Sequence, residues 1–204
     1  MGIKSLEIVI SGVGGQGNVR GAQMLGAAAV KAGFMVRVSD VFGIAQRGGP
    51  VLSHVRIGEV YGTMVSAHSA DVVVGLEPME ALRAVSAFLK PGGTVAMSTR
   101  PIYPVEVNTG KAAYPKMEAI LEAIRVATSR IITLDATEVA QSAGIPMAAN
   151  VVMLGVIAGT GILPFSADYL REAVREYIPR SIEENMVAFE SGLKIGESYM
   201  NPRT

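Results

Sequence analysis

The sequence predicts a single three-layer α/β/α domain with a mainly parallel sheet and a helical C-terminal third. Short β-branched segments alternate with longer helix-forming segments along the first two thirds of the chain, a pattern typical of parallel strands joined by crossover helices. The 204 residues fit one domain and contain no internal repeat or low-complexity linker. We therefore expect one domain over residues 1–204, with its C-terminal helices starting at about residue 148.

The first forty residues are expected to form a strand, a glycine-rich loop, a helix and a second strand. Residues 6–11 are apolar and β-branched and end in glycines, as a buried strand does. Residues 18–32 are rich in Ala and Leu, which favour a helix, and Gly33 is expected at the C-terminus of that helix. The second strand is predicted at residues 35–40.

The middle of the chain continues this alternation. Gly58-Glu59 separates residues 51–57 from residues 60–65, which predicts a hairpin or a bulged strand pair. The elements expected after it are a strand at 71–75, a helix at 78–89, a turn at 91–93, a strand at 94–98, an irregular segment at 99–114, a helix at 116–129 and a strand at 130–134.

The last third is expected to be helical. Four helices are predicted there: one capped by Asp135 that ends near residue 143, one over 148–158, one over 167–177 capped by Ser166, and one that opens with a capping box at 181–184. The helix over 148–158 is almost wholly apolar and is expected to be buried. Asn150 is predicted to be its N-cap, although this position also suits a residue that holds a substrate or a loop.

Charge and cysteine content exclude several functions. Eighteen basic and eighteen acidic residues balance, which argues against nucleic-acid binding because duplexes favour clustered Lys and Arg. No cysteine occurs, so this chain can build no disulfide, thiolate metal site or cysteine-held iron–sulfur cluster. Charged residues make up only 18% of the chain, which is explained either by a face that a partner covers or by the abundance of Ala and Gly.

A cytoplasmic location without a membrane partner is expected. No signal-peptide pattern opens the sequence. The longest apolar stretch, residues 151–163, is interrupted by glycines and is shorter than the roughly 20 residues of a spanning helix.

The glycine-rich loop is the first candidate site. Gly12-Val13-Gly14-Gly15-Gln16-Gly17 matches G-x-G-x-x-G between a predicted strand and a predicted helix, which makes the domain Rossmann-like. In such a loop Gly12 allows the tight turn, Gly14 lets the backbone approach a phosphate, and Gly17 permits close helix–strand packing. The same glycines could serve only to turn the chain. Asp40 lies near the place of a ribose-binding acid but a residue or two late, and a capping or solvent role explains it equally well.

A second candidate is the segment Gln46-Arg47-Gly48-Gly49-Pro50. Because it follows the second strand, we expect it at the same carboxyl edge of the sheet as the glycine loop, where ligands of open α/β sheets bind. Arg47 offers a forked cation for a phosphate or for a carboxylate of a ligand or partner, unless it is an ordinary surface residue. The predicted binding residues are thus Gly12, Gly14, Gly15, Gln16, Gly17, Gln46, Arg47, Gly48, Gly49 and Asn150.

Residues for catalysis or metal binding are scarce. His54 lies within a predicted strand and is expected on a sheet face, and no metal-ligand or triad spacing connects it with His68. Asp71 and Glu77 flank a strand end and could act as acid–base groups, but such residues more often cap the next helix. No catalytic residue and no metal site are predicted.

Several motifs, taken together, resemble the gamma-type domain of the 2-oxoacid:ferredoxin oxidoreductases, and within that family the small (beta) subunit of indolepyruvate ferredoxin oxidoreductase. The motifs are G-x-G-G-Q-G at 12–17, the segments 43–49 and 53–56, and the later pieces at 70–72, 75–78, 90–94 and 150–155. Ala45 to Gly49 followed by Ser53 to Arg56 resembles the arylpyruvate branch. Pro50 departs from the small polar residue usual at its position.

The resemblance implies a subunit function. An arylpyruvate, coenzyme A and oxidised ferredoxin would give an aryl-acetyl-CoA, carbon dioxide and reduced ferredoxin. Thiamine diphosphate and iron–sulfur clusters are implied in a large alpha subunit, and ferredoxin would act through the complex. This domain is implied to cover the active site and to contribute to coenzyme A handling at the shared sheet edge. The alternative is a free-standing NAD(P)- or FAD-binding oxidoreductase, suggested by the glycine loop and Asp40.

Overall fold

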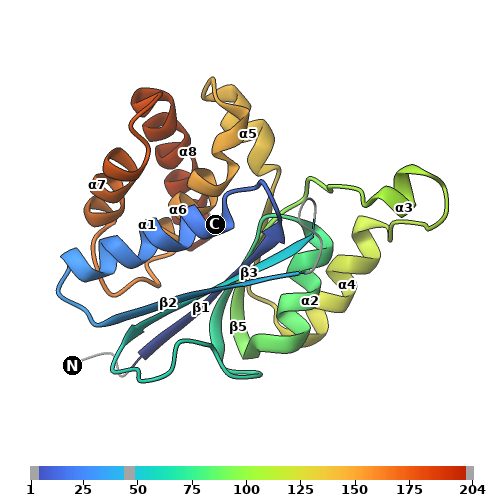
Figure 1. The fold of residues 1–204 in the computed structure, drawn as a ribbon, viewed down its shortest axis with the longest axis horizontal. Coiled ribbons are helices and arrows are strands. Elements are labelled where there is room, and N and C mark those ends of the chain that lie inside the picture. Colours follow the sequence, from blue (N-terminus) through green and yellow to red (C-terminus); the bar gives the residue numbers. More distant parts are fainter. Residues whose placement is uncertain (1–4, 44–48, 201–204) are drawn as a thin grey trace.

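Six strands form one sheet in the order β2-β3-β1-β4-β5-β6 (Figure 1). In the computed structural model, which describes residues 5–43 and 49–200, the strands are β1 (Ser5–Val13), β2 (Val36–Phe42), β3 (Pro50–Gly58), β4 (Ala70–Gly75), β5 (Leu89–Ser98) and β6 (Ile131–Leu134). β1, β4, β5 and β6 are parallel neighbours, whereas β3 is antiparallel to β1 and to β2. The predicted mainly parallel sheet is confirmed, with β3 as the exception.

The strands β2 and β3 form an antiparallel hairpin at one edge of the sheet. Val36 lies opposite Ile57 and Phe42 lies opposite Val51, so residues 43–49 connect two neighbouring strands. Because β3 reverses the direction, β2 points the same way as β1. The carboxyl ends of β1 and β2 therefore lie at the same edge of the sheet, as expected.

Residues 60–65 were predicted as the second arm of a hairpin around Gly58-Glu59, and this prediction is wrong. The segment contains no strand; instead it crosses the sheet face that carries His54, whose Nδ1 accepts a hydrogen bond from the Val65 N–H at 3.3 Å. Val60 and Val65 are both buried. These valines are apolar because this irregular segment packs on the sheet. A short strand shows the same pattern of apolar residues, so the sequence alone does not separate the two cases.

Helices cover both faces of the sheet (Figure 1), so the three-layer prediction is confirmed. One face carries α1 (Asn18–Lys31), α6 (Ala149–Gly159), α7 (Ala167–Tyr177) and α8 (Ile182–Met200), and the other carries α2 (Pro78–Phe88) and α4 (Met117–Ala127). Shorter elements are α3 (Val105–Asn108), α5 (Ala136–Ser142) and the 3₁₀ turn η1 (Pro146–Ala148).

The central strands are buried on both faces. Along β1, Ile8 and Ile10 pack against the layer of α1, α6 and α8, whereas Val9 packs with Val73 against α2 and α4. This double burial explains why β1 and β4 are near-continuous apolar runs, as strands of parallel sheets usually are. In β5, residues 90–93 form an irregularity, because Ala70 pairs with Leu89 while Val72 pairs with Thr94. The turn predicted at 91–93 is therefore a distortion inside a strand.

Helices α6 and α8 cross with their backbones in contact. A methyl group added at Gly192 would lie 2.0 Å from the carbonyl oxygen of Val152, and one at Gly155 would lie 2.2 Å from that of Phe189. Only glycine fits at such a crossing. The residues of α6 from 150 to 157 are all buried, so this helix forms the centre of the C-terminal layer, as its apolar sequence predicts.

Three helix caps have the residues expected from the sequence. Glu77 accepts a hydrogen bond from the Glu80 N–H, Asp135 from the Glu138 N–H and Ser166 from the Asp168 N–H. The capping box predicted at 181–184 is wrong, because Ser181 has a φ angle of +52° instead of the extended backbone of an N-cap residue. Asn150 is likewise not an N-cap, because α6 is preceded by Ala148 and Asn150 lies within its first turn.

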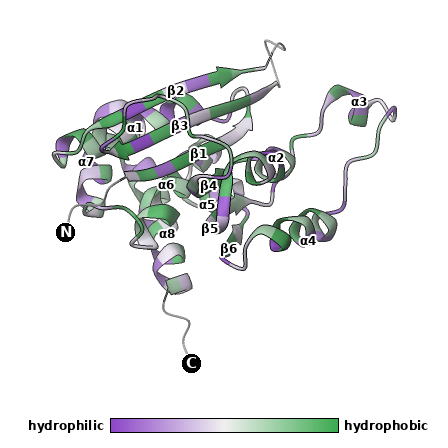
Figure 2. Ribbon diagram, turned by 90° about the horizontal axis from the view of Figure 1, so that it is seen from below, coloured by the Kyte–Doolittle hydropathy of each residue, from purple (hydrophilic) through white to green (hydrophobic). Residues whose placement is uncertain are grey.

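The segment between β5 and α4 projects from the body of the domain and includes α3 (Figures 1 and 2). It is fastened at its base by Tyr114, whose hydroxyl donates to the carboxylate of the buried Glu77. Burial, followed by the hydrogen bond to Glu77, raises the pKa of Tyr114 far above its usual range. Tyr103 packs edge-to-face on Tyr114, with 5.1 Å between ring centroids. The irregular segment predicted at 99–114 is thus tied to the end of β4.

Candidate functional site

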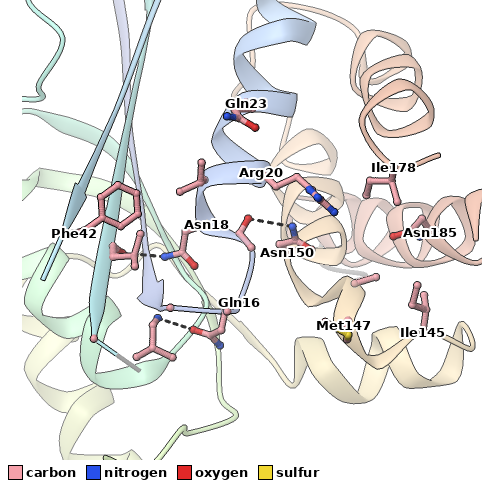
Figure 3. A pocket seen from close by; sticks show the side chains of 18 of the residues that line it. Gln16, Asn18, Arg20, Gln23, Phe42, Ile145, Met147, Asn150, Ile178 and Asn185 are labelled. Atoms are coloured by element: carbon pink, nitrogen blue, oxygen red, sulfur yellow. Dashed lines mark hydrogen bonds between the residues drawn. The ribbon is translucent and has the colours of Figure 1, made fainter. Parts of the chain in front are cut away.

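A cavity of about 1170 Å³ opens at the carboxyl edge of the sheet, between the end of the β2–β3 hairpin and the C-terminal helical layer (Figure 3). Its walls come from the glycine loop, the start of α1, the hairpin, η1 with α6, and the start of α8. The described lining residues are Val13, Gly14, Gly15, Gln16, Gly17, Asn18, Val19, Arg20, Gln23, Phe42, Gly43, Gly49, Pro50, Val51, Ile145, Met147, Ala148, Asn150, Ile178, Arg180, Ser181 and Asn185.

The glycine loop is held tightly against the sheet. Gly15 and Gly17 have φ angles of +104° and +83°, a left-handed backbone that favours glycine. The Gly14 N–H donates to the Gly49 carbonyl at 2.9 Å, which joins the loop to the start of β3. A Cβ atom at Gly12 would lie 2.7 Å from the Gln16 Oε1. The Gln16 side chain therefore covers Gly12, which is not among the described residues that line the cavity.

Gln16 connects the loop to Leu76, the residue that follows β4, instead of pointing freely into the cavity. Its Oε1 accepts a hydrogen bond from the Val13 N–H at 2.9 Å, and its Nε2 donates to the Leu76 carbonyl at 2.7 Å. Both ends of the amide are therefore engaged by the protein. Gln16 lines the cavity as predicted, and its amide fixes the position of the loop.

Asn150 reaches the glycine loop from α6. Its Nδ2 donates to the Gly17 carbonyl at 3.2 Å (Figure 3), and its side chain would be 2.6 Å from a methyl group at Gly17. The alternative role foreseen for this residue, holding a loop, is the one that the structure gives it. On the other side of the loop, the buried Asn18 donates to the Val51 carbonyl at 2.9 Å.

The cavity is electrostatically suited to an anion. Two arginines line it, Arg20 from the first turn of α1 and Arg180 from the segment before α8, and none of the described lining residues is acidic. The N-terminus of α1 borders the cavity beside the glycine loop, and the unpaired N–H groups of a helix start attract negative charge. The cavity lining also includes the apolar side chains Ile145, Met147 and Ile178.

The second predicted motif is only partly described. Gln46, Arg47 and Gly48 lie outside the described residues, so their predicted binding role stays a prediction. Gly43 and Gly49, on either side of them, both line the cavity. The connection that carries the motif thus leaves and rejoins the described chain at the cavity wall, at the sheet edge predicted for it.

Sequence reasoning missed several polar residues of the site, among them Asn18, Arg20, Arg180 and Asn185. The first two follow the glycine motif directly, and a polar residue at a helix start was the signal that could have found them. Arg180 and Asn185 come from the far end of the chain. Nothing in their local sequence shows that α8 begins beside the glycine loop.

The other residues weighed from the sequence lie away from the cavity. Asp40 accepts a hydrogen bond from the Ser53 hydroxyl across the hairpin at 2.5 Å, so its carboxylate is already engaged. His54 is fully buried, packs edge-to-face on Phe88, and has a pKa lowered by that burial. Asp71 accepts a hydrogen bond from the Glu7 N–H at 2.7 Å.

Two features are absent from the part of the chain that the structure describes. No group of three or more His, Cys, Asp or Glu side chains is arranged there to hold a metal ion. Within residues 5–43 and 49–200, no helix is both long enough and apolar enough to span a bilayer.

An open α/β sheet with a glycine loop and a cationic cavity at its carboxyl edge defines the class of Rossmann-like ligand-binding domains. Residues 7–195 match the family model described as pyruvate ferredoxin/flavodoxin oxidoreductase, and the chain belongs to this family. The resemblance seen in the sequence motifs is confirmed.

Known relatives cover the chain almost completely. It is 42% identical to the indolepyruvate oxidoreductase subunit IorB of Pyrococcus horikoshii, over 98% of this chain and 100% of the relative. Among solved structures, the pyruvate oxidoreductase subunit PORC of Thermotoga maritima superimposes with a TM-score of 0.68 and 26% identity, covering 94% of this chain and 97% of that one. A 2-oxoglutarate:ferredoxin oxidoreductase of Magnetococcus marinus shares the fold with a TM-score of 0.70 and 18% identity, over 96% of this chain and 32% of that chain. The chain is therefore a small subunit of a 2-oxoacid oxidoreductase complex, as the motifs predict.

Proposed function

We propose that the chain is the small subunit of an indolepyruvate-type, arylpyruvate-oxidising ferredoxin oxidoreductase. The observation that carries this proposal is the 42% identity, over full length, to an indolepyruvate oxidoreductase subunit, compared with 32% identity, over 91% of this chain, to a gamma subunit shared by pyruvate and ketoisovalerate oxidoreductases. The motif Ala45 to Gly49 followed by Ser53 to Arg56 supports the same branch.

The chain is proposed to act only together with a large alpha subunit. Oxidative decarboxylation of a 2-oxoacid needs a group that stabilises a carbanion and a path for two electrons. The sequence contains no cysteine, so cysteine-held iron–sulfur clusters are assigned to the partner. Thiamine diphosphate is assigned to the partner because the family resemblance implies it there. Ferredoxin would then accept electrons from the complex. This division of roles also accounts for the low charge content, because part of the surface would be covered by the partner.

Coenzyme A is the ligand proposed for the cavity, where it would supply the thiol that accepts the acyl group. Its phosphates suit the wall formed by the glycine loop, Arg20 and Arg180, because arginine forks and helix N-termini bind phosphate oxygens. Its pantetheine arm suits the apolar side chains Ile145 and Met147. Arg47 belongs to the segment whose described neighbours Gly43 and Gly49 line the cavity, and it is proposed as a further phosphate ligand.

The test is reconstitution with a candidate large subunit, a cysteine-rich and thiamine-binding protein encoded next to this chain. The two proteins should co-purify, and arylpyruvate-dependent ferredoxin reduction should require both. Arg47→Ala should leave the fold intact and raise the KM for coenzyme A while kcat changes less. A pair that never co-purifies, with an activity that never depends on this chain, would overturn the proposal.

A further inference from the structure

Two carbonyl groups at the cavity share an unusual arrangement. Each belongs to the residue that precedes a helix: Gly17 before α1 and Ser181 before α8. Both residues have a left-handed backbone, with φ angles of +83° and +52°. Ser181 is a non-glycine residue in that region, which costs conformational energy unless contacts around it compensate.

Each of these carbonyls accepts two hydrogen bonds, one from its own helix and one from an asparagine side chain. The Gly17 carbonyl accepts from the Gly21 N–H at 2.8 Å and from the Asn150 Nδ2 at 3.2 Å. The Ser181 carbonyl accepts from the Asn185 N–H at 3.0 Å and from the Asn185 Nδ2 at 2.8 Å. The second bond fixes the first turn of the helix beyond what the helix alone provides.

The two asparagines are built into the protein and are not surface residues. Asn150 is 7% exposed and Asn185 is 2% exposed. Their donor groups are used on carbonyls, and the Asn150 Oδ1 accepts from the Val151 N–H at 3.0 Å. Both residues nevertheless line the cavity, so they shape its wall while their amide groups bond to the backbone, as Figure 3 shows for Asn150.

Each helix start that is fixed in this way carries an arginine of the cavity. Arg20 lies in the first turn of α1, which Gly17 precedes, and Arg180 directly precedes Ser181. The two arginines are exposed and, as long flexible side chains, depend on their backbone for a defined position. Moving either helix start would move the cation that it presents.

We propose that Asn150 and Asn185 are positioning residues that hold Arg20 and Arg180 in place at the cavity for a phosphorylated ligand. The inference rests on the proposed function in that coenzyme A is taken as this ligand. The asparagines would fix the helix starts that carry the arginines, and they would not contact the ligand themselves. Asn150, predicted from sequence as a binding residue, is thereby given an indirect role.

A double-mutant cycle on the full-length chain, purified alone and in the complex, tests the inference. Asn185→Ala and Arg180→Ala should each raise the Kd for coenzyme A about tenfold, measured by calorimetry. Because Asn185 acts through Arg180, adding Asn185→Ala to Arg180→Ala should change the Kd no further. The same result is expected for Asn150→Ala combined with Arg20→Ala.

Two further variants separate positioning from general damage. Asn185→Ser should recover most of the affinity, because a serine hydroxyl in a helix can donate to the carbonyl four residues earlier, which here belongs to Ser181. Asn108→Ala is the matched control, since its Nδ2 also donates to a carbonyl, that of Tyr103, at 3.1 Å, but in α3. It should leave the Kd unchanged.

The outcomes distinguish this inference from the proposed function. Multiplicative effects of the paired substitutions, or full affinity in Asn185→Ala, would overturn the positioning role while coenzyme A binding stands. Pyrophosphate serves as a second probe. If the wild-type chain binds pyrophosphate but not coenzyme A, and the single and double variants show the expected non-additive changes in the Kd for pyrophosphate, the positioning role is supported and the coenzyme A assignment fails. Binding of neither probe overturns both. Should Asn185→Ala not fold, Asn185→Ser and the Asn150 cycle carry the test.

Discussion

At the scale of single residues, two glycines of one loop have a left-handed backbone for different reasons. A methyl group at Gly15 would meet nothing within 4 Å, so only its φ of +104° favours glycine there. A methyl group at Gly17 would lie 2.6 Å from the Asn150 amide, in addition to a φ of +83°. Glycine is therefore favoured at position 15 by its backbone conformation alone. At position 17 it is favoured both by its backbone conformation and by the close approach of Asn150 from α6.

Alanine substitutions should separate these two effects. Gly15→Ala is expected to lower the free energy of unfolding by about 1 kcal/mol, the usual cost of a left-handed residue with a side chain. Gly17→Ala should lower it by roughly 2–4 kcal/mol, because Asn150 must also shift. Denaturant unfolding of both variants measures the difference. Equal losses would mean that Asn150 yields without cost and that the α6 contact does not restrain the loop.

The sequence predicted the location of the site better than it predicted the hydrogen-bond partners of the side chains in it. The spacing of Gly12, Gly14 and Gly17 located the loop, because glycine positions are a local signal. The contacts of Gln16 and Asn150 could not be predicted, because each joins two residues that are far apart in the sequence. The separation is 60 positions for Gln16 and Leu76 and 133 positions for Asn150 and Gly17. An amide looks the same in sequence whether it binds a ligand or a backbone carbonyl.

At the scale of elements, the C-terminal layer depends on helices that approach each other closely. Glycines on α6 and α8 face the partner helix at the crossing, and the added methyl groups would lie 2.0–2.2 Å from backbone oxygens. Backbone atoms cannot move aside as side chains do. The crossing therefore fixes the position of α8, and with it the start of that helix at the cavity.

Gly192→Ala should be strongly destabilising. We expect a loss of about 3 kcal/mol or more, or no folded protein, because overpacking against a backbone cannot be relieved by a change of rotamer. Gly21→Ala in α1 is the control, since its methyl group would be at an ordinary 3.9 Å from Ile10. It should raise the free energy of unfolding by roughly 0.5–1 kcal/mol. Similar thermal unfolding of the two variants would contradict the assigned close crossing.

The pair Arg171–Glu190 links α7 to α8 and should give the protein a measurable acid sensitivity. Two hydrogen bonds of 2.6 and 3.0 Å join the guanidinium to the carboxylate. The hydrogen bonding from Arg171 holds the pKa of Glu190 below its ordinary value of 4.5. A depressed pKa means that the stabilisation is complete above the ordinary value and is lost as the pH falls through the lowered one.

Glu190→Gln should therefore lower the free energy of unfolding at pH 7 by about 0.5–1 kcal/mol, a small effect because the carboxylate is 38% exposed and solvent screens it. The difference from the wild type should shrink below about pH 4.5, the ordinary pKa, and vanish in stronger acid. Urea midpoints measured from pH 3 to 7 test this. Parallel curves over the whole range would show that the pair contributes no pH dependence.

At the scale of the whole molecule, the strand order decides which ligands fit the glycine loop. In a dinucleotide-binding domain the second strand lies next to the first, so that its terminal acid reaches the ribose. Here the antiparallel β3 separates β1 from β2, and the Asp40 carboxylate is bonded to Ser53. The glycine loop, proposed above to bind phosphate, therefore does not have a ribose-binding acid on an adjacent second strand.

The isolated chain is therefore expected not to bind NAD, NADP or FAD. Calorimetry with each cofactor at millimolar concentration should detect no heat of binding, whereas coenzyme A, the proposed ligand, should give a saturable signal. Tight binding of a nicotinamide or flavin cofactor would restore the free-standing oxidoreductase as the better hypothesis.

Local signals predicted most of the fold, and long-range pairing accounts for the rest. β-branched runs and capping residues such as Asp135 and Ser166 placed most elements within a few residues of their observed ends. The pairing of β3 with β2 could not be foreseen, because the alternation at 51–57 fits either neighbour. In the same way, the motifs indicated one wall of the cavity, while the wall that contains Arg180 depends on how the last helices pack.

The edge position of the β2–β3 hairpin bears on how such subunits diversify in evolution. Seven residue pairs, from Val36–Ile57 to Phe42–Val51, keep the two strands in register, and within the described part of the chain no strand lies on the outer side of β2. The two strands thus hold each other in register, so a change in the length or sequence of the connection between them need not alter the parallel strands or α1. New substrates or partner subunits could be accommodated at this connection while the glycine loop stays the same.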